Sequence, residues 1–241
     1  MSSLLESARG KGDAAGVAPR AFFSLRRLYR FVLGLPKTLA FNFAYLPFGQ
    51  AMRLPVFVSH RVWLRDLSGE VSLADTRTGA VRIGFGDVGI FDQQRSRTIW
   101  QVSGKVAFMG TADIGHGSKI AVTGELVVGN RLTIAAESSI VAQRSITIGD
   151  DVLISWDALI IDTDAHRIFD ATGHQVNGAM PIRIGNSVWL GCRTLVLKGV
   201  EIADGVVVAA ASTVTRPVDK SNVIVGGNPA RVIRENIRWK R

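Results

Sequence analysis

The 241-residue chain has almost no cysteine and no long apolar run. Its one cysteine, Cys192, excludes an intramolecular disulfide framework and suits a reducing compartment. Residues 1–20 are polar and small and contain no apolar central run, so we expect no signal peptide. The longest uncharged stretch, residues 38–52, is too short and too rich in turn-forming residues to span a bilayer. These absences exclude a disulfide-rich secreted domain and predict a cytoplasmic protein without a transmembrane helix.

Acidic residues are scarce at both ends of the chain. Residues 1–61 contain nine Lys or Arg and two acids, and residues 231–241 contain five and one, whereas the whole chain has a formal net charge of +9. The cations of residues 26–37 alternate with aromatic and aliphatic side chains. This segment therefore either lies peripherally on an anionic membrane, at its inner face, or caps one end of the fold with its arginines solvated. No nucleic-acid-binding motif accompanies the charge, so we expect no nucleic-acid partner.

Aliphatic residues recur every six positions through the second half of the chain. A run of six extends from Ile184 to Val214, and a set of three extends from Ile148 to Ile160. Neither a helix nor an alternating strand has this period, whereas hexapeptide units build a parallel β-helix. Upstream sets, which begin at Ile114, are separated by steps of eight residues, so three hexads close one coil and insertions leave from one corner. A sandwich of short strands with chance spacing is the alternative, and the unbroken run argues against it.

The expected fold class is thus an all-β solenoid, a parallel β-helix with a loop insertion, a short helical N-terminal segment and a C-terminal tail. We expect disorder over residues 1–19 and a basic amphipathic helical segment over 20–53, with breaks near 34–36 and 47–49. The β-helix is expected over 54–225, with irregular coils to about 109 and a loop insertion over 163–181. A turn and a basic, weakly helical tail are expected over 226–241.

Three segments of the repeat region resemble the hexapeptide-repeat acyltransferases, in the maltose and galactoside acetyltransferase branch: residues 182–191 (IRIGNSVWLG), 200–205 (VEIADG) and 226–233 (GGNPARVI). Residues 36–48 and 83–91 resemble a subgroup associated with bacterial surface-polysaccharide synthesis. The resemblance implies a left-handed β-helix, a homotrimer with active sites between subunits, and an O-acetyltransferase that moves an acyl group from acetyl-CoA to a sugar hydroxyl. Transfer to an amino sugar, to serine or to a xenobiotic, and a non-catalytic β-helical scaffold, are the alternatives.

One histidine, His166, lies where the longest gap interrupts the repeat. A histidine titrates near physiological pH and is a natural general base, and the family's catalytic histidine stands at this point, although Arg167 replaces the proline that usually follows it. The candidates for binding the acceptor or orienting the imidazole are acids and an aromatic residue near this gap, namely Trp156, Asp157, Asp162, Asp164 and Asp170.

The resemblance also implies an acyl-donor site. Its residues are Gly191, Cys192, Ala209 and Thr215 along the pantetheine arm, with Arg216 and Arg231 near the nucleotide phosphates. Backbone N–H groups at the corners are expected to hold the amides of the arm and to polarise the thioester oxygen. No base is evident in the hexad of Cys192, so we expect no covalent acyl-thiol intermediate.

The other histidines are expected to be structural. We expect His116 to be exposed at a turn and His174 to be solvated in the loop insertion. A zinc site of three histidines needs a close pair, and the only near pair, His166 and His174, is eight residues apart. We therefore expect no metal.

Overall fold

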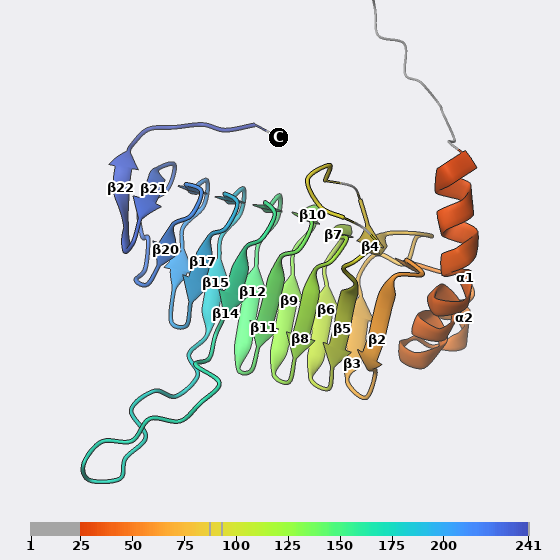
Figure 1. Cartoon of the computed structure of the whole chain (residues 1–241), viewed down its shortest axis with the longest axis horizontal. Coiled ribbons are helices and arrows are strands. Elements are labelled where there is room, and N and C mark those ends of the chain that lie inside the picture. Colours follow the sequence, from red (N-terminus) through yellow and green to blue (C-terminus); the bar gives the residue numbers. More distant parts are fainter. Residues whose placement is uncertain (1–24, 87, 93, 241) are drawn as a thin grey trace, which may run out of the picture.

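The computed structural model describes residues 25–86, 88–92 and 94–240, with no side-chain description for 25–28. The expectation of disorder over residues 1–19 lies outside these residues. The described chain is a three-sided parallel β-helix with two helices at its N-terminal end (Figure 1). None of its helices is both long and apolar enough to cross a membrane.

Each coil contributes one strand to each of three sheets. Sheet A contains, in order, β1 (Val56–Val58), β4 (Val81–Phe85), β7 (Ala112–Gly115), β10 (Leu132–Ile134), β13 (Leu153–Ile154), β16 (Trp189–Leu190), β19 (Val207–Val208), β21 (Ile224–Gly227) and β22 (Ala230–Arg234). Sheet B contains β2 (Val62–Asp66), β5 (Thr98–Val102), β8 (Lys119–Val122), β11 (Ser139–Ala142), β14 (Leu159–Ile161), β17 (Leu195–Leu197) and β20 (Thr213–Val214). Sheet C contains β3 (Glu70–Leu73), β6 (Lys105–Phe108), β9 (Glu125–Val128), β12 (Ser145–Ile148), β15 (Ile182–Ile184) and β18 (Glu201–Ile202).

The six-residue repeat forms the core of this prism. Aliphatic side chains of the repeat stack in register between coils, as Ile148 pairs with Ile184 and Ile184 with Ile202. All nine aliphatics of the two sets that begin at Ile148 and Ile184 are buried. Every strand pair is parallel except β21 with β22. The predicted parallel β-helix is confirmed, because only a coil closed every three hexads brings these residues into one column.

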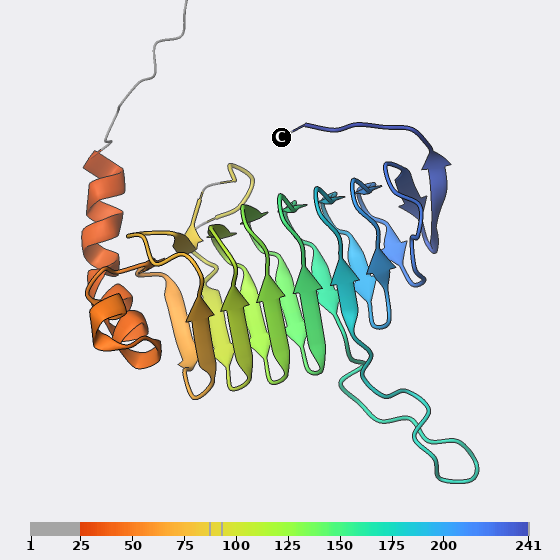
Figure 2. The same ribbon diagram turned by 180° about the vertical axis from the view of Figure 1, so that it is seen from behind.

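Three corners join the sheets, and most of the expected site residues lie at two of them. The first corner runs from sheet A to sheet B, and the second from sheet B to sheet C. At the first corner, one residue of each successive turn has a positive φ: Glu137, Asp157, Arg193 and Ala211, with φ between 56 and 61°. At the second corner, the loop of residues 162–181 leaves between β14 and β15 and extends away from the prism (Figure 2).

The N-terminal helices α1 (Leu25–Tyr45) and α2 (Phe48–Ala51) cover the open end of the stack. The expected break near residues 34–36 is wrong, because α1 runs through Pro36 without interruption. The helix is held against the first coil on both sides of the proline: a Cβ on Gly34 would lie 2.5 Å from the Val58 carbonyl oxygen, and Lys37 Nζ donates to the carbonyl oxygen of His60 at 2.6 Å. These contacts offset the backbone hydrogen bond that Pro36 cannot donate.

A hairpin and an extended tail finish the C-terminal end. The turn expected after residue 226 joins β21 to the antiparallel strand β22, so the expected weak helical character of the tail is wrong. Beyond it the chain runs back over the stack, where Trp239 Nε1 donates to the Ser187 carbonyl oxygen at 2.7 Å. The ring of Trp239 packs on that of Trp189 with centroids 5.8 Å apart. The tail therefore covers part of sheet A.

Candidate active site

The histidine loop, residues 162–181, begins at a carboxylate that is engaged within the chain. Asp162 is buried, and its two carboxylate oxygens accept the backbone N–H groups of Gln143 and Arg144 at 2.7 and 2.8 Å. Gln143 and Arg144 form the same corner in the preceding coil. The expected role of Asp162 in binding the acceptor has no support in this geometry, because the carboxylate anchors the loop to the stack instead.

Asn177 ties the two arms of the histidine loop together. Its side-chain amide nitrogen donates to Asp164 Oδ2 at 2.9 Å and to the carbonyl oxygen of His166 at 2.8 Å. Its side-chain oxygen accepts the backbone N–H of Ile168 at 2.7 Å. One side chain from the returning arm therefore bonds to Asp164, His166 and Ile168, which restricts the backbone at the histidine.

Lys198 links this arrangement to the next coil. Its ammonium group donates to Asp164 Oδ2 and, at 3.1 Å, to the carbonyl oxygen of Asn177. The hydrogen bond from Lys198, followed by that from Asn177, holds the pKa of Asp164 below its ordinary value of 3.8. Asp164 therefore stays ionised across the physiological range and serves as the anchor of the loop.

His166 is exposed at this anchored root. Its backbone N–H donates to the carbonyl oxygen of Asp164 at 2.7 Å, and Ala165 between them has a φ of 61°. Because of this tight turn, the chain changes direction between β14 and residue 166. The imidazole is therefore exposed to solvent on a backbone that is held in place.

The tip of the histidine loop is a separate unit. Asp170 accepts the hydroxyl of Thr172 at 2.7 Å and the backbone N–H of His174 at 3.0 Å, and these bonds lower the pKa of its carboxyl. His174 Nδ1 lies 2.7 Å from the Thr172 hydroxyl. Asp170 and His174 thus shape the turn at the tip, and their side-chain hydrogen bonds stay within it.

Five of the expected site residues lie at the first corner, one strand of sheet B away from the loop. Trp156 and Asp157 form this corner between β13 and β14, and Asp157 Oδ2 pairs with Arg193 Nε at 3.3 Å. Gly191 and Cys192 form it one coil later, and Ala209 two coils later. The structure therefore places these residues in one column along the axis of the stack.

Two backbone N–H groups of this column are engaged within the stack. The N–H groups of Gly191 and Ala209 donate to the carbonyl oxygens of Val208 and Val225, at 2.8 Å each. These two groups therefore do not hold the pantetheine arm, and the expectation that corner N–H groups hold it stays a prediction for the other positions. The coils are closely spaced here, because a Cβ on Gly191 would lie 2.7 Å from the backbone nitrogen of Ala210.

Thr215, Arg216 and Arg231 are exposed. Val196 pairs with Val214, so Thr215 and Arg216 follow at the second corner, above Leu197 and Lys198. Arg231 lies on β22, and its guanidinium donates to the carbonyl oxygen of Ala230 at 2.9 Å. Both arginines are therefore exposed to solvent in the C-terminal coils. Arg216 follows β20 at the second corner, whereas Arg231 lies on β22 of sheet A.

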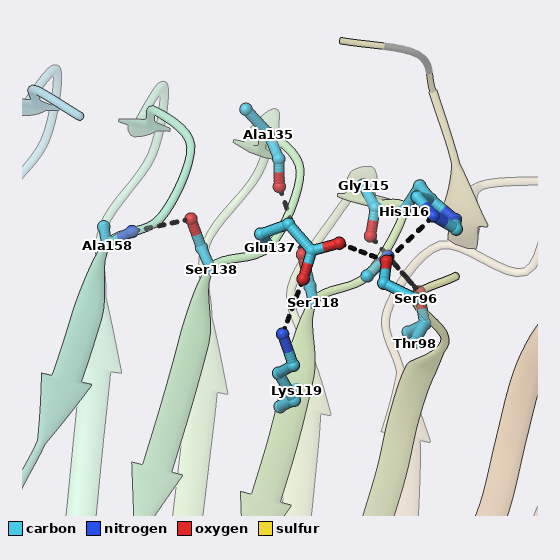
Figure 3. A network of polar contacts seen from close by, with 11 residues as sticks. Ser96, Thr98, Gly115, His116, Ser118, Lys119, Ala135, Glu137, Ser138 and Ala158 are labelled. Carbon is cyan, nitrogen blue, oxygen red and sulfur yellow. Dashed lines mark hydrogen bonds and ion pairs between the residues drawn. The ribbon is translucent and has the colours of Figure 1, made fainter. Parts of the chain in front are cut away.

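A polar cluster also occupies the first corner nearer the N-terminus (Figure 3). His116 is buried, contrary to the expectation that it is exposed, and its Nε2 lies 3.1 Å from Ser96 Oγ. Ser96 donates to Glu137 Oε1, and Glu137 Oε2 accepts from Lys119 at 2.7 Å. Ser96 comes from the long connection between β4 and β5, which covers the histidine. The cluster therefore fastens this connection to two coils.

Sequence reasoning missed Asn177 and Lys198. The only signal for Lys198 was its place in the repeat, since Ile161 pairs with Leu197 and Lys198 follows at the corner from which the loop leaves. Within the described residues, no three His, Cys, Asp or Glu side chains converge as metal ligands would.

Comparison with known proteins gives relatives of one kind. No family model matches the chain. The galactoside O-acetyltransferase of Escherichia coli K12 is 36% identical over 129 residues, which cover 50% of this chain and 56% of that protein. The polysialic acid O-acetyltransferase of Escherichia coli O1:K1 / APEC is 36% identical over 128 residues, covering 52% and 41%. A putative colanic acid biosynthesis acetyltransferase, WcaF of Escherichia coli K12, is 35% identical over 119 residues, covering 49% and 63%.

The chain thus spans about half the length of these relatives. Among solved structures, the polySia specific acetyltransferase NeuO has a TM-score of 0.57 at 24% identity, with 77% of this chain and 79% of that chain covered. This likeness shows a common fold. The resemblance inferred from the repeat motifs is confirmed: the chain is similar to hexapeptide-repeat acetyltransferases and has their left-handed parallel β-helix.

Proposed function

We propose that the chain is an acetyl-CoA-dependent O-acetyltransferase that acts on a sugar hydroxyl of a surface-polysaccharide precursor, with His166 as general base. The observation that carries the proposal is the exposed His166 on a loop whose root is fixed by Asp164, Asn177 and Lys198. The relatives support it, because they are named as acetyltransferases of galactosides, polysialic acid and colanic acid biosynthesis.

The chemistry is a direct transfer. His166 takes the proton from the acceptor hydroxyl while the hydroxyl oxygen attacks the carbonyl carbon of the thioester. A tetrahedral intermediate forms, and its collapse breaks the carbon–sulfur bond. The thiolate of coenzyme A leaves and receives the proton that His166 holds, which returns the histidine to its neutral form. Atoms and charges therefore balance without a metal or a covalent enzyme intermediate.

The placement of the site residues supports a site between subunits of a trimer. His166 leaves from the second corner, whereas Trp156, Asp157, Gly191, Cys192 and Ala209 lie at the first. The three residues of β14 or β17 separate the corners by about 10 Å, well beyond hydrogen-bond reach. In a cyclic trimer the second corner of one subunit can meet the first corner of its neighbour. The half-buried Trp156 and Leu197 are apolar surface for this contact, whereas Trp189, on sheet A, packs against Trp239 of the tail.

The acyl donor lies along the first corner. The column from Gly191 and Cys192 to Ala209 leads along the axis toward the hairpin that carries Arg231. A pantetheine arm lying along it places the nucleotide phosphates beside Arg231, with Arg216 as a second candidate cation. Thr215 then belongs to the second-corner side of the groove, and Asp157 and Trp156 remain candidates for the acceptor.

The test is release of free thiol from acetyl-CoA with galactosides, amino sugars, serine and no acceptor. Full-length protein should release thiol with a sugar hydroxyl, and His166→Ala should lower turnover by about two to four orders of magnitude. The melting temperature of the variant should be unchanged, because His166 is exposed. Absence of thiol release with all acceptors would instead assign the chain to the scaffold class. Activity of the variant within a few-fold of wild type would remove His166 from the mechanism.

A further inference from the structure

The N-terminal cap uses only one of its faces to close the stack. β1 has no coil beneath it, and its free edge is satisfied by two buried side chains of α1. Asn42 donates to the carbonyl oxygen of Val56 at 2.7 Å and accepts its N–H at 3.2 Å, and Thr38 Oγ1 accepts the N–H of Val58 at 2.9 Å. Phe41 is fully buried beside them. Protection of the strand edge is therefore complete on this inner face.

The opposite face of the cap is apolar and exposed. We define the outer face of the cap as Tyr29, Val32, Leu33, Leu39 and Phe43 of α1 together with Phe48 and Met52. At about 100° per residue, the five α1 members fall within about 120° of the helix circumference and so lie on one side of the helix. Phe48 is 73% exposed and Tyr29 is 64% exposed. A helix that served only as a cap would present polar residues to water here, so this surface indicates a partner.

The sequence of the cap and its flanks is rich in cations and lacks acids, although Lys37 bonds inward to the first coil and Glu70 lies beside Ala44 and Tyr45 at the end of α1. The sequence has no Asp or Glu between Asp13 and Asp66. The same stretch contains eight cations, namely Arg20, Arg26, Arg27, Arg30, Lys37, Arg53, Arg61 and Arg65. Arg53 follows Met52, the C-cap residue of α2, and is exposed. Each cation close to an anionic surface favours association, and no acid in this stretch opposes it.

We propose that the outer face of the cap docks on the surface of an anionic phospholipid bilayer, with α1 lying in the plane of the interface. An exposed apolar stripe beside an excess of cations is the pattern of helices that bind there. A second copy of the chain is a poorer occupant, because an isologous contact would bring two acid-free cationic segments together. The proposal rests on the cap alone and is independent of the proposed chemistry.

Docking at the cap would leave the histidine loop free. The cap lies at one end of the stack, whereas the loop leaves from coils toward the other end (Figure 2). A protein bound by its cap therefore keeps residues 162–181 in water, where an acceptor can reach them. Binding to membranes and acetyl transfer are then separable measurements.

The experiment is co-sedimentation of the full-length protein with vesicles of phosphatidylglycerol and phosphatidylcholine, and with vesicles of phosphatidylcholine alone. Wild type should bind the anionic vesicles, and less strongly at high salt because the charges are screened. Val32→Ser with Phe48→Ser should weaken binding by about tenfold or more, since it removes apolar side chains from the interface. Met109→Ser with Ile233→Ser is the matched control, because both residues are comparably exposed but lie away from the cap. The control should bind like wild type.

Four outcomes would overturn the proposal. The first is absence of wild type from the pellet with both vesicle types, and the second is sedimentation of the outer-face variant to the same extent as wild type. A lower mass of the outer-face variant in light scattering, without vesicle binding by wild type, would assign the face to a second copy. The last outcome concerns nucleic acid. If wild type and the outer-face variant bind vesicles equally, and a single-stranded oligonucleotide displaces both equally, the cations of the cap bind nucleic acid instead of lipid. Thiol release by the outer-face variant should match wild type, which separates failure of this proposal from failure of the proposed function.

Discussion

Lys198 connects the histidine loop to the coil that follows it, and its effect is local. Its ammonium group bonds to Asp164 and to the backbone of Asn177, and Asn177 in turn holds the carbonyl oxygen of His166. Lys198→Met keeps the side-chain length but removes the charge. We expect turnover to fall about tenfold and trypsin to cleave after the exposed Arg167 about tenfold faster, because the root of the loop opens more often.

Lys105→Met is the matched control for this variant, since Lys105 forms an exposed ion pair with Glu70 at 3.2 Å away from the loop. It should leave both rates unchanged, as exposed pairs contribute little. Cleavage is followed at the Arg167 bond by mass spectrometry, so that the loss of a lysine does not affect the measurement. Equal cleavage of wild type and Lys198→Met would show that the lysine does not anchor the loop.

The same anchor predicts a pH dependence. The pKa of Asp164 is lowered in the folded protein, first by Lys198 and then by Asn177, from an ordinary value of 3.8. A depressed carboxyl pKa stabilises the loop above that ordinary value, and the stabilisation is lost as the pH falls through the lowered pKa. Loop amides of residues 164–177 should therefore keep their hydrogen-exchange protection down to about pH 4 and lose it below. Asp164→Asn should show reduced protection without this pH dependence.

Single residues show how far sequence reasoning reaches. The gap in the repeat together with the family resemblance singles out His166, and the structure places it exposed at the root of the loop, while its role as general base stays a prediction. Asp162 has the same neighbourhood in sequence, yet its carboxylate is taken by Gln143 and Arg144 from another coil. Burial of His116 likewise depends on a connection some 20 residues away in the sequence. Such partners follow from the stacking of coils, and a local pattern does not specify them.

At the scale of elements, glycines set the spacing of coils at the second corner. A Cβ on Gly69 would lie 2.3 Å from the Gly104 carbonyl oxygen, one on Gly104 2.1 Å from that of Gly124, and one on Gly124 2.3 Å from that of Arg144. Backbone atoms cannot move aside without separating the coils. Gly124→Ala should therefore lower the free energy of unfolding by about 2 kcal/mol or more, measured by urea denaturation.

Gly49→Ala is the control for this substitution. A Cβ at Gly49 would meet nothing within 4 Å, and the residue lies inside α2. Alanine should raise the free energy of unfolding there by about 0.5 kcal/mol, because it restricts the unfolded chain. A Gly124→Ala protein as stable as wild type would show that the corner tolerates a wider spacing than its backbone contacts indicate.

The strands of the stack were predictable and the ends were not. A hexad specifies which side chain points inward, so each coil follows from its own residues. Pro36 predicts a broken helix by the same local reasoning, but contacts of Gly34 and Lys37 with the first coil keep α1 continuous. Residues 230–234 pair with β21 because the last coil leaves a strand edge open, which a pattern within the tail does not reveal.

At the scale of the whole molecule, the two corners make a prediction that distinguishes a shared site from a site within one chain. His166→Ala removes the proposed base at the second corner and leaves the first corner intact. Cys192→Tyr places a bulky ring on the first corner, where the half-buried Cys192 lies, and leaves the histidine loop intact. Each variant alone should be inactive, and each should form a trimer in light scattering.

Mixing the two variants should then restore activity. In trimers exchanged at random from equal amounts, a site that takes its histidine from one subunit and its corner from the neighbour is intact with a probability of about one quarter. We therefore expect about one quarter of the wild-type rate of thiol release after subunit exchange by mild denaturation and refolding. A site contained within a single chain has no intact copy in the mixture and would give no recovery. A wild-type protein that is monomeric and active would contradict the trimer directly.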